Sequence, residues 1–334
     1  MDTHTLTTAA TTVAAPLSRD AFWSAVEDAH ALFLRGTLDR GGLFARLEEI
    51  HARAPRREAK APAEGAFPLA DAGRRLALGY DTLMYWPALQ EYFGHSDYVN
   101  FGYWDETTAS AAAASENLVA RLAGRLPAGV TSLLDVACGK GATTRFLERR
   151  FPDASITGIN ISLRQLETCR ANAPRSRFLR MDATALEFAD DSFDAIVCVE
   201  AAFHFRTRER FLGEAYRVLK PGGALVLCDL LLTRAAEARR PGRHVENYLE
   251  SPEAYAALAH RLGFEATSME DARRACFEGA FRHLVRFSHE KFLEGALTSE
   301  GVRTLCGHIF ETVPDFRHYL LASFRKPAKA PGEP

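Results

Sequence analysis

Apolar positions along the chain follow two patterns, and the pattern changes near residue 115. Between Leu17 and His51 apolar side chains recur at helical spacing with a break at Gly36, which predicts two helices. From Ser115 onward, short apolar runs rich in β-branched residues alternate with amphipathic segments. Such alternation is typical of a parallel sheet covered by helices on both faces, so the predicted fold class is α/β.

Six strands and three helices are predicted in the alternating part. The strands are Ser132–Val136, Ser155–Ile161, Arg177–Met181, Phe193–Val199, Ala224–Leu230 and His318–Phe324. The helices are Ser115–Leu126, Thr143–Arg150 and a segment that carries Leu163, Leu166 and Ala171.

Composition indicates how the chain is divided. Residues 1–16 are low in complexity, so we expect a disordered tail. Residues 17–95 are expected to form a helical extension or lid, with a linker rich in Pro and charge near 52–68. Residues 96–328 contain the alternating pattern and constitute the predicted main domain.

Charge and cysteine content exclude several classes of protein. The 334 residues include 41 Lys+Arg and 43 Asp+Glu, for a net charge of −2, which argues against a nucleic-acid binder with a broad basic face. The six cysteines form no CxxC pair and no metal-like cluster, which predicts reduced thiols, a cytoplasmic location and no metal site. Neither a signal peptide nor an apolar run that could span a bilayer is evident, so we expect no membrane partner.

A glycine-containing turn follows the first predicted strand. Its residues Ala137, Gly139 and Gly141 let backbone amides approach a ligand, and the helix that follows favours an anionic group. A dinucleotide fingerprint has a third glycine where this chain has Thr144. Asp135 would also repel a diphosphate, whereas it suits a ligand with an ammonium group. The turn therefore predicts a zwitterionic ligand rather than a dinucleotide.

These residues resemble those of a known family. Asp135-Val-Ala-Cys-Gly-Lys-Gly141 is similar to the first motif of class I S-adenosylmethionine-dependent methyltransferases, acidic-x-G-x-G-x-G, with Ala137 for its first glycine. Met181-Asp182-Ala183 and Leu219-Lys-Pro-Gly-Gly223 resemble later motifs of that family, and the resemblance extends from about Asp97 to Lys326. It implies a Rossmann-like methyltransferase fold, a doubly wound, mostly parallel seven-stranded sheet, here with an N-terminal helical extension.

The resemblance also implies S-adenosylmethionine as the cofactor and assigns its contacts. The contacts are Asp135, Ala137, Gly139 and Gly141 for the amino-acid end, Asn160, Ile161 and Gln165 for the ribose, and Asp182 and Ala183 for the adenine. Asn160 stands where the family usually has an acid that accepts both ribose hydroxyls, and Gln165 matches the glutamine that often accompanies this neutral form.

An unusually aromatic segment, Tyr92 to Trp104, precedes the alternating part and follows a predicted helix that begins at Arg74. From its composition it is either a cover over a core edge or a lid over a ligand. Its second half, Asn100-Phe-Gly-Tyr-Trp104, resembles the lid of small-molecule methyltransferases. The resemblance makes Tyr98 and Tyr103 candidates for contact with the carboxylate end of the cofactor.

Two candidate catalytic residues follow the fourth predicted strand. Glu200 comes directly after apolar strand residues. It either hydrogen-bonds a neighbouring loop or is a partly buried acid of raised pKa that acts as a base or counter-charge. His204 is either a second base or a ring packed under the lid. A base matters here because a methyl acceptor must often lose a proton.

The predicted function is methyl transfer from S-adenosylmethionine to a small, largely apolar metabolite of secondary metabolism. C-methylation is slightly favoured over O- or N-methylation. The segment around Glu200 resembles two groups, natural-product methyltransferases and isoprenoid diphosphate C-methyltransferases, but Val199 before Glu200 and the two alanines after it do not carry the substrate over. The alternatives are a nicotinamide-dependent oxidoreductase and a non-catalytic cofactor-binding assembly subunit. We also expect a homodimer or higher homo-oligomer formed through the N-terminal helices.

Overall fold

The computed structural model describes residues 15–55, 81–239 and 245–328. These residues form two units. Residues 15–55 and 286–314 make the smaller unit, and the other described residues make the larger one. Most of the predicted tail and linker lies outside the described residues, as does the start of the helix predicted from Arg74.

This division differs from the expected one in two places. Residues 81–95, assigned from the sequence to the N-terminal extension, belong to the larger unit, and residues 286–314, assigned to the main domain, belong to the smaller one. Local patterns do not reveal such groupings, because the grouping of segments depends on which apolar faces of the helices pack together. The boundary between residues 95 and 96 stays a prediction from composition.

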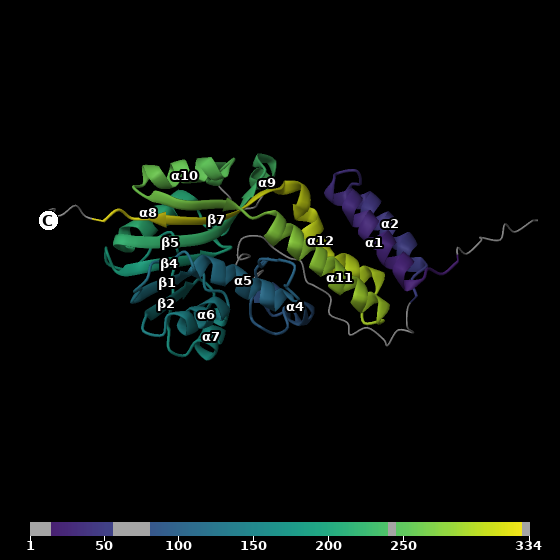
Figure 1. Cartoon of the computed structure of the whole chain (residues 1–334), viewed down its shortest axis with the longest axis horizontal. Helices are drawn as coiled ribbons and strands as arrows, with labels where there is room; N and C mark the ends of the chain where they lie inside the picture. Colours follow the sequence, from purple (N-terminus) through teal and green to yellow (C-terminus); the bar gives the residue numbers. More distant parts are fainter. Residues whose placement is uncertain (1–14, 56–80, 240–244, 329–334) are drawn as a thin grey trace, which may run out of the picture. The chain divides into compact units, whose positions relative to one another are not determined.

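A seven-stranded sheet is the centre of the larger unit (Figure 1). In spatial order its strands are β3 (Arg177–Arg180), β2 (Ser155–Asn160), β1 (Ser132–Val136), β4 (Phe193–Val199), β5 (Leu219–Leu232), β7 (Phe316–Arg325) and β6 (Glu265–Asp271). Strands β1 to β5 pair in parallel, and β7 runs antiparallel between β5 and β6. The predicted α/β class and mostly parallel sheet are confirmed.

Helices α5 (Ala111–Ala123), α6 (Ala142–Arg150), α7 (Leu163–Asn172), α8 (Arg208–Val218) and α10 (Pro252–Arg261) pack on this sheet. The larger unit also contains α4 (Pro87–Tyr92), α9 (Arg234–Arg239) and the first half of α11 (Gly279–Leu293). The main core packs the central strands against α8 and α10 through fully buried side chains such as Ile196, Phe211, Leu225 and Tyr255. Burial of the central strands explains their continuous apolar runs.

Two strands differ from their sequence prediction. Strand β6 was not predicted, because its sequence Glu265–Asp271 is polar and an edge strand needs little apolar surface. Strand β5 begins earlier than expected. Leu219 pairs with Phe193 and Ala224 with Ala195, so the Lys-Pro-Gly-Gly segment between Leu219 and Ala224 bulges out of the strand.

Strand order reverses between the neighbouring strands β1 and β4. The chain leaves β1 toward β2 and β3 on one side and returns to β4 on the other. Val136 at the end of β1 is paired with both Ile159 and Cys198, so the turns after all three strands open at one edge of the sheet. Ligands of open α/β sheets bind at such a reversal.

The smaller unit consists of α1 (Arg19–Leu34), α2 (Arg40–Ala52), the second half of α11 and α12 (Ser299–Thr312). The predicted break is confirmed, since α1 ends just before Gly36, which has a φ of 73°. The ring of Phe292 stacks on Phe22 and lies 4.1 Å from the ring of His51. Side chains of α1 and α2 therefore pack against α11 within the smaller unit.

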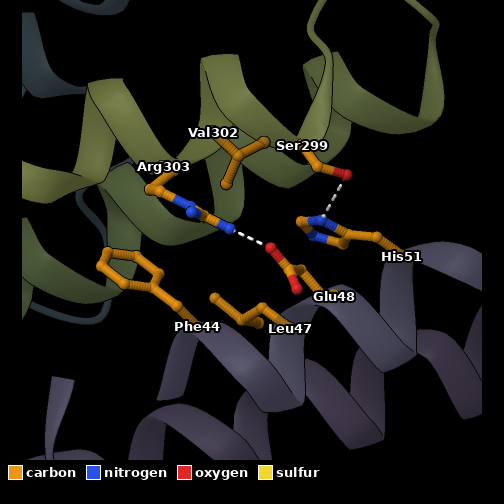
Figure 2. A pocket seen from close by; sticks show the side chains of 7 residues that line it. All are labelled: Phe44, Leu47, Glu48, His51, Ser299, Val302 and Arg303. Atoms are coloured by element: carbon orange, nitrogen blue, oxygen red, sulfur yellow. Dashed lines mark hydrogen bonds and ion pairs between the residues drawn. The ribbon is translucent and has the colours of Figure 1, made fainter. Parts of the chain in front are cut away.

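Figure 2 shows a pocket between α2 and α12 in the smaller unit. It is lined by Phe44, Leu47, Glu48, His51, Ser299, Val302 and Arg303. A hydrogen bond of 3.1 Å joins Nδ1 of His51 to Oγ of Ser299, and Arg303 forms an ion pair with Glu48. None of the predicted site residues lines this pocket, and its polar contacts join the two helices.

No helix among the described residues is long and apolar enough to cross a membrane. Each of the six cysteines, all of them within the described ranges, is a buried free thiol.

Candidate active site

The turn between β1 and α6 has the backbone that its small residues predict. Ala137, Gly139 and Gly141 have φ values of 58°, 54° and 86°, in the left-handed region that favours glycine. A Cβ on Gly141 would lie 2.9 Å from Cα of Cys169 in α7, so only glycine fits there. Gly141 also caps α6 without a side chain, which leaves the first amides of that helix available to an anion.

Asp135 lies buried below this turn, with 1% of its surface exposed. Burial raises the pKa of Asp135 to about 7, although a hydrogen bond from Thr144 opposes the shift. That bond runs from Oγ1 of Thr144 to Oδ2 of Asp135 over 2.6 Å. Thr144, which stands in place of a third glycine, thus ties the start of α6 to the end of β1.

The three predicted ribose contacts lie where β2 ends and α7 begins. Asn160 donates from Nδ2 to the carbonyl oxygen of Gly139 at 3.2 Å and to Oε1 of Gln165 at 2.9 Å. Its Oδ1 accepts from the backbone amide of Ser162 at 3.0 Å. The structure therefore brings Asn160 and Gln165 together and connects them to the glycine turn. Ile161, beside them, is 44% exposed.

The predicted adenine contacts follow β3. Oδ1 of the exposed Asp182 accepts from the backbone amide and the hydroxyl of Thr184, both at 2.8 Å, whereas Ala183 is buried. The amide of Met181 donates to the carbonyl oxygen of Asn160 at 3.1 Å. Hydrogen bonds thus join the turn after β1 to the turn after β2, and the turn after β2 to the turn after β3. This is the order of the predicted amino-acid, ribose and adenine contacts.

Residues 96–104, the aromatic strip, cross from the turn after β1 to the turn after β4. At one end Asp97 forms a 2.6 Å ion pair with the buried Lys140 of the glycine turn. Burial alone would raise the pKa of Asp97, but hydrogen bonds from Lys140 and Asn172 outweigh it and lower that pKa. At the other end the amide of Phe101 donates to Oε1 of Glu200 at 2.7 Å.

The two tyrosines predicted to contact the cofactor have different surroundings. Tyr98 is 5% exposed, and burial, reinforced by the charge of Glu116, raises its pKa to about 12. The ring of Tyr103 lies 3.6 Å from the guanidinium carbon of Arg121, and its amide donates to Ala114. Its carbonyl oxygen accepts from Nδ2 of Asn117 at 3.5 Å, so these contacts of Tyr103 are all with α5 and not with the glycine turn.

Glu200, at the end of β4, holds several elements together. Its Oε1 accepts from the hydroxyl of Tyr319 in β7 as well as from the amide of Phe101. The pKa of Glu200 is raised to about 7, because the effect of burial outweighs the lowering by these two hydrogen bonds. The φ of Glu200 is 49°, and its amide donates to the carbonyl oxygen of Cys228 at 3.1 Å. One of the two predictions for Glu200 was a hydrogen bond to a neighbouring loop. The aromatic strip is such a loop, since Phe101 donates to Glu200.

His204 lies in a short helical turn, Ala202–His204, and its half-buried ring is 3.8 Å from that of Phe203. A buried ion pair holds this turn. Asp229 accepts from the amide of Phe203 at 2.9 Å and from Nε of Arg208 at 2.7 Å. Arg208 and Asp229 are both almost completely buried.

Four residues of this site were missed by sequence reasoning: Asp81, Asn100 as a polar contact, Asp229 and Tyr319. Asp81 accepts hydrogen bonds from Ser162 and Gln165, and Tyr319 donates to Glu200. Their partners are far away in the sequence, so no local spacing could reveal them. Among the described residues, no group of three or more His, Cys, Asp or Glu side chains could hold a metal ion.

The arrangement fits the cofactor that the resemblance implies. A Cβ on Gly139 would meet nothing nearer than Cε of Met84 at 3.9 Å, so a ligand can approach this backbone. Asn100 is 7% exposed, and its Oδ1 has no hydrogen-bond partner within the described residues. An orphaned acceptor is costly unless a donor such as an ammonium group reaches it. Asn100 lies in the strip between Asp97, which pairs with Lys140, and Phe101, which donates to Glu200.

Comparisons with known proteins agree with this arrangement. A family model described as a methyltransferase domain matches residues 134–227. The 27-O-demethylrifamycin SV methyltransferase of Amycolatopsis mediterranei (strain S699) is 33% identical over 208 residues, which cover 58% of this chain and 74% of that protein. The O-methyltransferase cnsE of Penicillium expansum is 31% identical over 195 residues, covering 53% and 68%.

Among solved structures, the cyclase SpnF has a TM-score of 0.61 at 24% identity, covering 78% of this chain and 98% of that one. This likeness concerns the fold. The sequence comparisons favour methyl transfer over the oxidoreductase alternative.

Gly141→Ala should lower the affinity for S-adenosylhomocysteine at least about tenfold, because the added Cβ collides with α7 and a left-handed alanine costs roughly 1–2 kcal/mol. Titration calorimetry measures the affinity. Gly213→Ala is the matched control, since Gly213 lies in α8 with nothing within 4 Å of its Cβ position. It should leave the affinity unchanged and stabilise the protein by about 0.5–1 kcal/mol. Equal affinities of the two variants would contradict the assigned role of the turn.

Asp229→Asn should lower the free energy of unfolding by about 3 kcal/mol, because it leaves the buried guanidinium of Arg208 without its nearest counter-charge. Urea denaturation followed by circular dichroism measures the change. Asp190→Asn removes the 72% exposed partner of Arg217 and should cost less than about 1 kcal/mol. A loss for Asp229→Asn as small as that of the control would show that the buried pair does not hold this turn.

Proposed function

We propose a function on the premise that this chain belongs to the S-adenosylmethionine-dependent methyltransferase family: it methylates a hydroxyl oxygen of an apolar secondary metabolite. The observation that carries this proposal is the position of Glu200, a half-buried acid of raised pKa at the strand end beside the glycine turn. We further propose a cytoplasmic location, in keeping with six free thiols.

The choice of oxygen replaces the slight preference for carbon that the sequence suggested. The names of two similar proteins, a 27-O-demethylrifamycin SV methyltransferase and an O-methyltransferase, support it. An aromatic cluster that includes Phe101, whose amide donates to Glu200, supports an apolar acceptor. The rings of Phe277 and Phe316 stack at 4.0 Å, and Phe101 packs edge-on against both.

The cofactor is S-adenosylmethionine, and we assign its binding to the three joined turns. Backbone groups from Ala137 to Gly141, with the open N-terminus of α6, hold the carboxylate of its amino-acid end. Oδ1 of Asn100 accepts from the ammonium group. Asp135 orders the turn from below through Thr144. Asp182, already fixed by Thr184, accepts from the adenine amino group.

Glu200 is assigned the role of general base. When bound, S-adenosylmethionine supplies a methyl group on a sulfonium, and a hydroxyl acceptor must lose its proton as that methyl is transferred. Oε1 of Glu200 is occupied by Phe101 and Tyr319, whereas no hydrogen bond reaches Oε2 within the described residues. Oε2 accepts the proton of the hydroxyl. A pKa of about 7 suits such a base near neutral pH.

His204 is assigned contact with the acceptor. It follows Glu200 in the same turn, its ring is half-buried, and the buried Asp229 fixes the backbone beside it. The imidazole then orients the acceptor hydroxyl toward Glu200 by a hydrogen bond.

The test uses 27-O-demethylrifamycin SV as a probe acceptor with S-adenosylmethionine that carries a trideuterated methyl group. Mass spectrometry detects the transfer, and NMR shows whether the label is on oxygen, carbon or nitrogen. We expect label on oxygen. Label on carbon or nitrogen would contradict the proposed acceptor atom, and tight cofactor binding without transfer to this and other hydroxylated polyketides would favour a non-catalytic role.

Glu200→Gln should lower turnover by roughly 10²–10⁴-fold, as expected for loss of a general base, with little change in S-adenosylhomocysteine affinity. In the unaltered enzyme, turnover should fall about tenfold per pH unit below pH 7, because protonation of Glu200 removes the base. The variant should lack this limb of the pH profile. An unchanged profile would exclude Glu200 as the base.

Tyr319→Phe is the matched control for the pH profile. It keeps the ring but removes a hydrogen bond that lowers the pKa of Glu200, so the limb should move to higher pH rather than disappear.

A further inference from the structure

The position that would meet the ribose carries no charge in this chain. Asn160 is a neutral residue, and its amide is engaged: Nδ2 donates to Gly139 and Gln165, and Oδ1 accepts from Ser162. A ribose presents two neighbouring hydroxyls, each able to donate. A carboxylate has about four acceptor sites and accepts such a pair of donors well, whereas the engaged amide of Asn160 does not.

A carboxylate from another part of the chain lies at this place. Oδ1 of Asp81 accepts from Oγ of Ser162 and from Nε2 of Gln165, each at 2.7 Å. Asp81 therefore binds two residues that are themselves bonded to Asn160. Its other oxygen, Oδ2, receives no hydrogen bond from any residue that the structure describes, and the side chain is half-buried rather than free in solvent.

The segment that carries Asp81 is packed on the cofactor turn. Residues 81–84 are helical, and Cε of Met84 is the nearest atom to a Cβ built on Gly139. The hydroxyl of Tyr85 is 2.5 Å from Oγ1 of Thr168 in α7, and its ring lies 3.9 Å from the guanidinium carbon of Arg164. Contacts with the glycine turn and with α7 thus fix the place of Asp81.

We propose that Asp81 is the carboxylate that binds the ribose hydroxyls of the cofactor. Oδ1 is held by Ser162 and Gln165, which orients the group, and Oδ2 retains two acceptor sites for two donors. The charge that β2 lacks at Asn160 is supplied by the segment before α4. This inference rests on the cofactor assigned above and not on the methyl acceptor.

A purely structural role makes a different prediction. If Asp81 only held Ser162 and Gln165 in place, its loss would weaken every cofactor analogue to the same extent. If Asp81 binds the hydroxyls, its loss affects a ligand only when those hydroxyls are present. The decisive quantity is therefore the ratio of two affinities.

The experiment is titration calorimetry with S-adenosylhomocysteine and with its analogue that lacks both ribose hydroxyls. The unaltered protein should bind the first roughly 10–100-fold more tightly, since hydrogen bonds to a charged group are at stake. In Asp81→Asn and Asp81→Ala this ratio should shrink to less than about threefold. Asp153→Asn is the matched control: it removes the same charge from an exposed residue before β2 and should keep the full ratio.

Three outcomes would overturn the proposal. One is a ratio in both Asp81 variants equal to that of the unaltered protein, which would assign Asp81 a structural role. Another is a ratio near one in the unaltered protein, a measurement that does not depend on how the variants fold. The third, absence of S-adenosylhomocysteine binding by the unaltered protein, would overturn the cofactor assignment as well. Failure to methylate any acceptor, with the ratios as expected, would contradict only the proposed function.

Discussion

Strand order reverses between β1 and β4, and the carboxyl ends of both strands therefore open at one edge of the sheet beside that of β2. A chain that passed through its strands in spatial order would leave no such crevice. Here the reversal places an unusual backbone, the left-handed turn from Ala137 to Gly141, next to a strained acid, Glu200. The proposed site for the amino-acid end of the cofactor and the proposed base both depend on this juxtaposition.

The aromatic strip is bonded to two turns at that edge of the sheet. Its ion pair with Lys140 holds it to the cofactor turn, and its hydrogen bond to Glu200 holds it to the turn after β4. In the proposed mechanism Glu200 has two roles that use different oxygens: Oε1 accepts from the strip and from Tyr319, and Oε2 is assigned the proton of the acceptor. A left-handed φ at a non-glycine residue costs about 1–2 kcal/mol, and such strain persists where several bonds hold the residue.

The distribution of charge along this edge is consistent with a single ribose-binding acid. Asp81 and Asn160 are both bonded to Gln165, one through each atom of its amide. An acid at residue 160 would place a second carboxylate in this small network, and like charges that share a site disfavour ionisation. A neutral Asn160 instead donates to the turn through Gly139 and leaves the charge to Asp81. The neutral Asn160, which stands where the family usually has an acid, is thus matched by the proposed ribose-binding carboxylate of Asp81.

Local patterns were sufficient for most of the sheet and for the glycine turn. The apolar runs of β1, β2, β4 and β5 identify buried parallel strands. The short sequence from Asp135 to Gly141 specifies its own backbone, because its small residues at 137, 139 and 141 take the left-handed φ that favours glycine. Such features depend on neighbours within a few residues. The polar edge strand β6 and the grouping of residues 286–314 with α1 and α2 have no comparable signal.

By itself the sequence determined the α/β class, the order of the motifs and the residue types that a sulfonium cofactor needs. Only the tertiary structure decided which distant groups complete them. It paired Asp81 with Gln165, Tyr319 with Glu200 and Asp97 with Lys140, and it directed Tyr103 to α5. The physical reason is that hydrogen bonds and ion pairs depend on separation in space. Partners brought together by strand crossover leave no periodic or short-range trace in the chain.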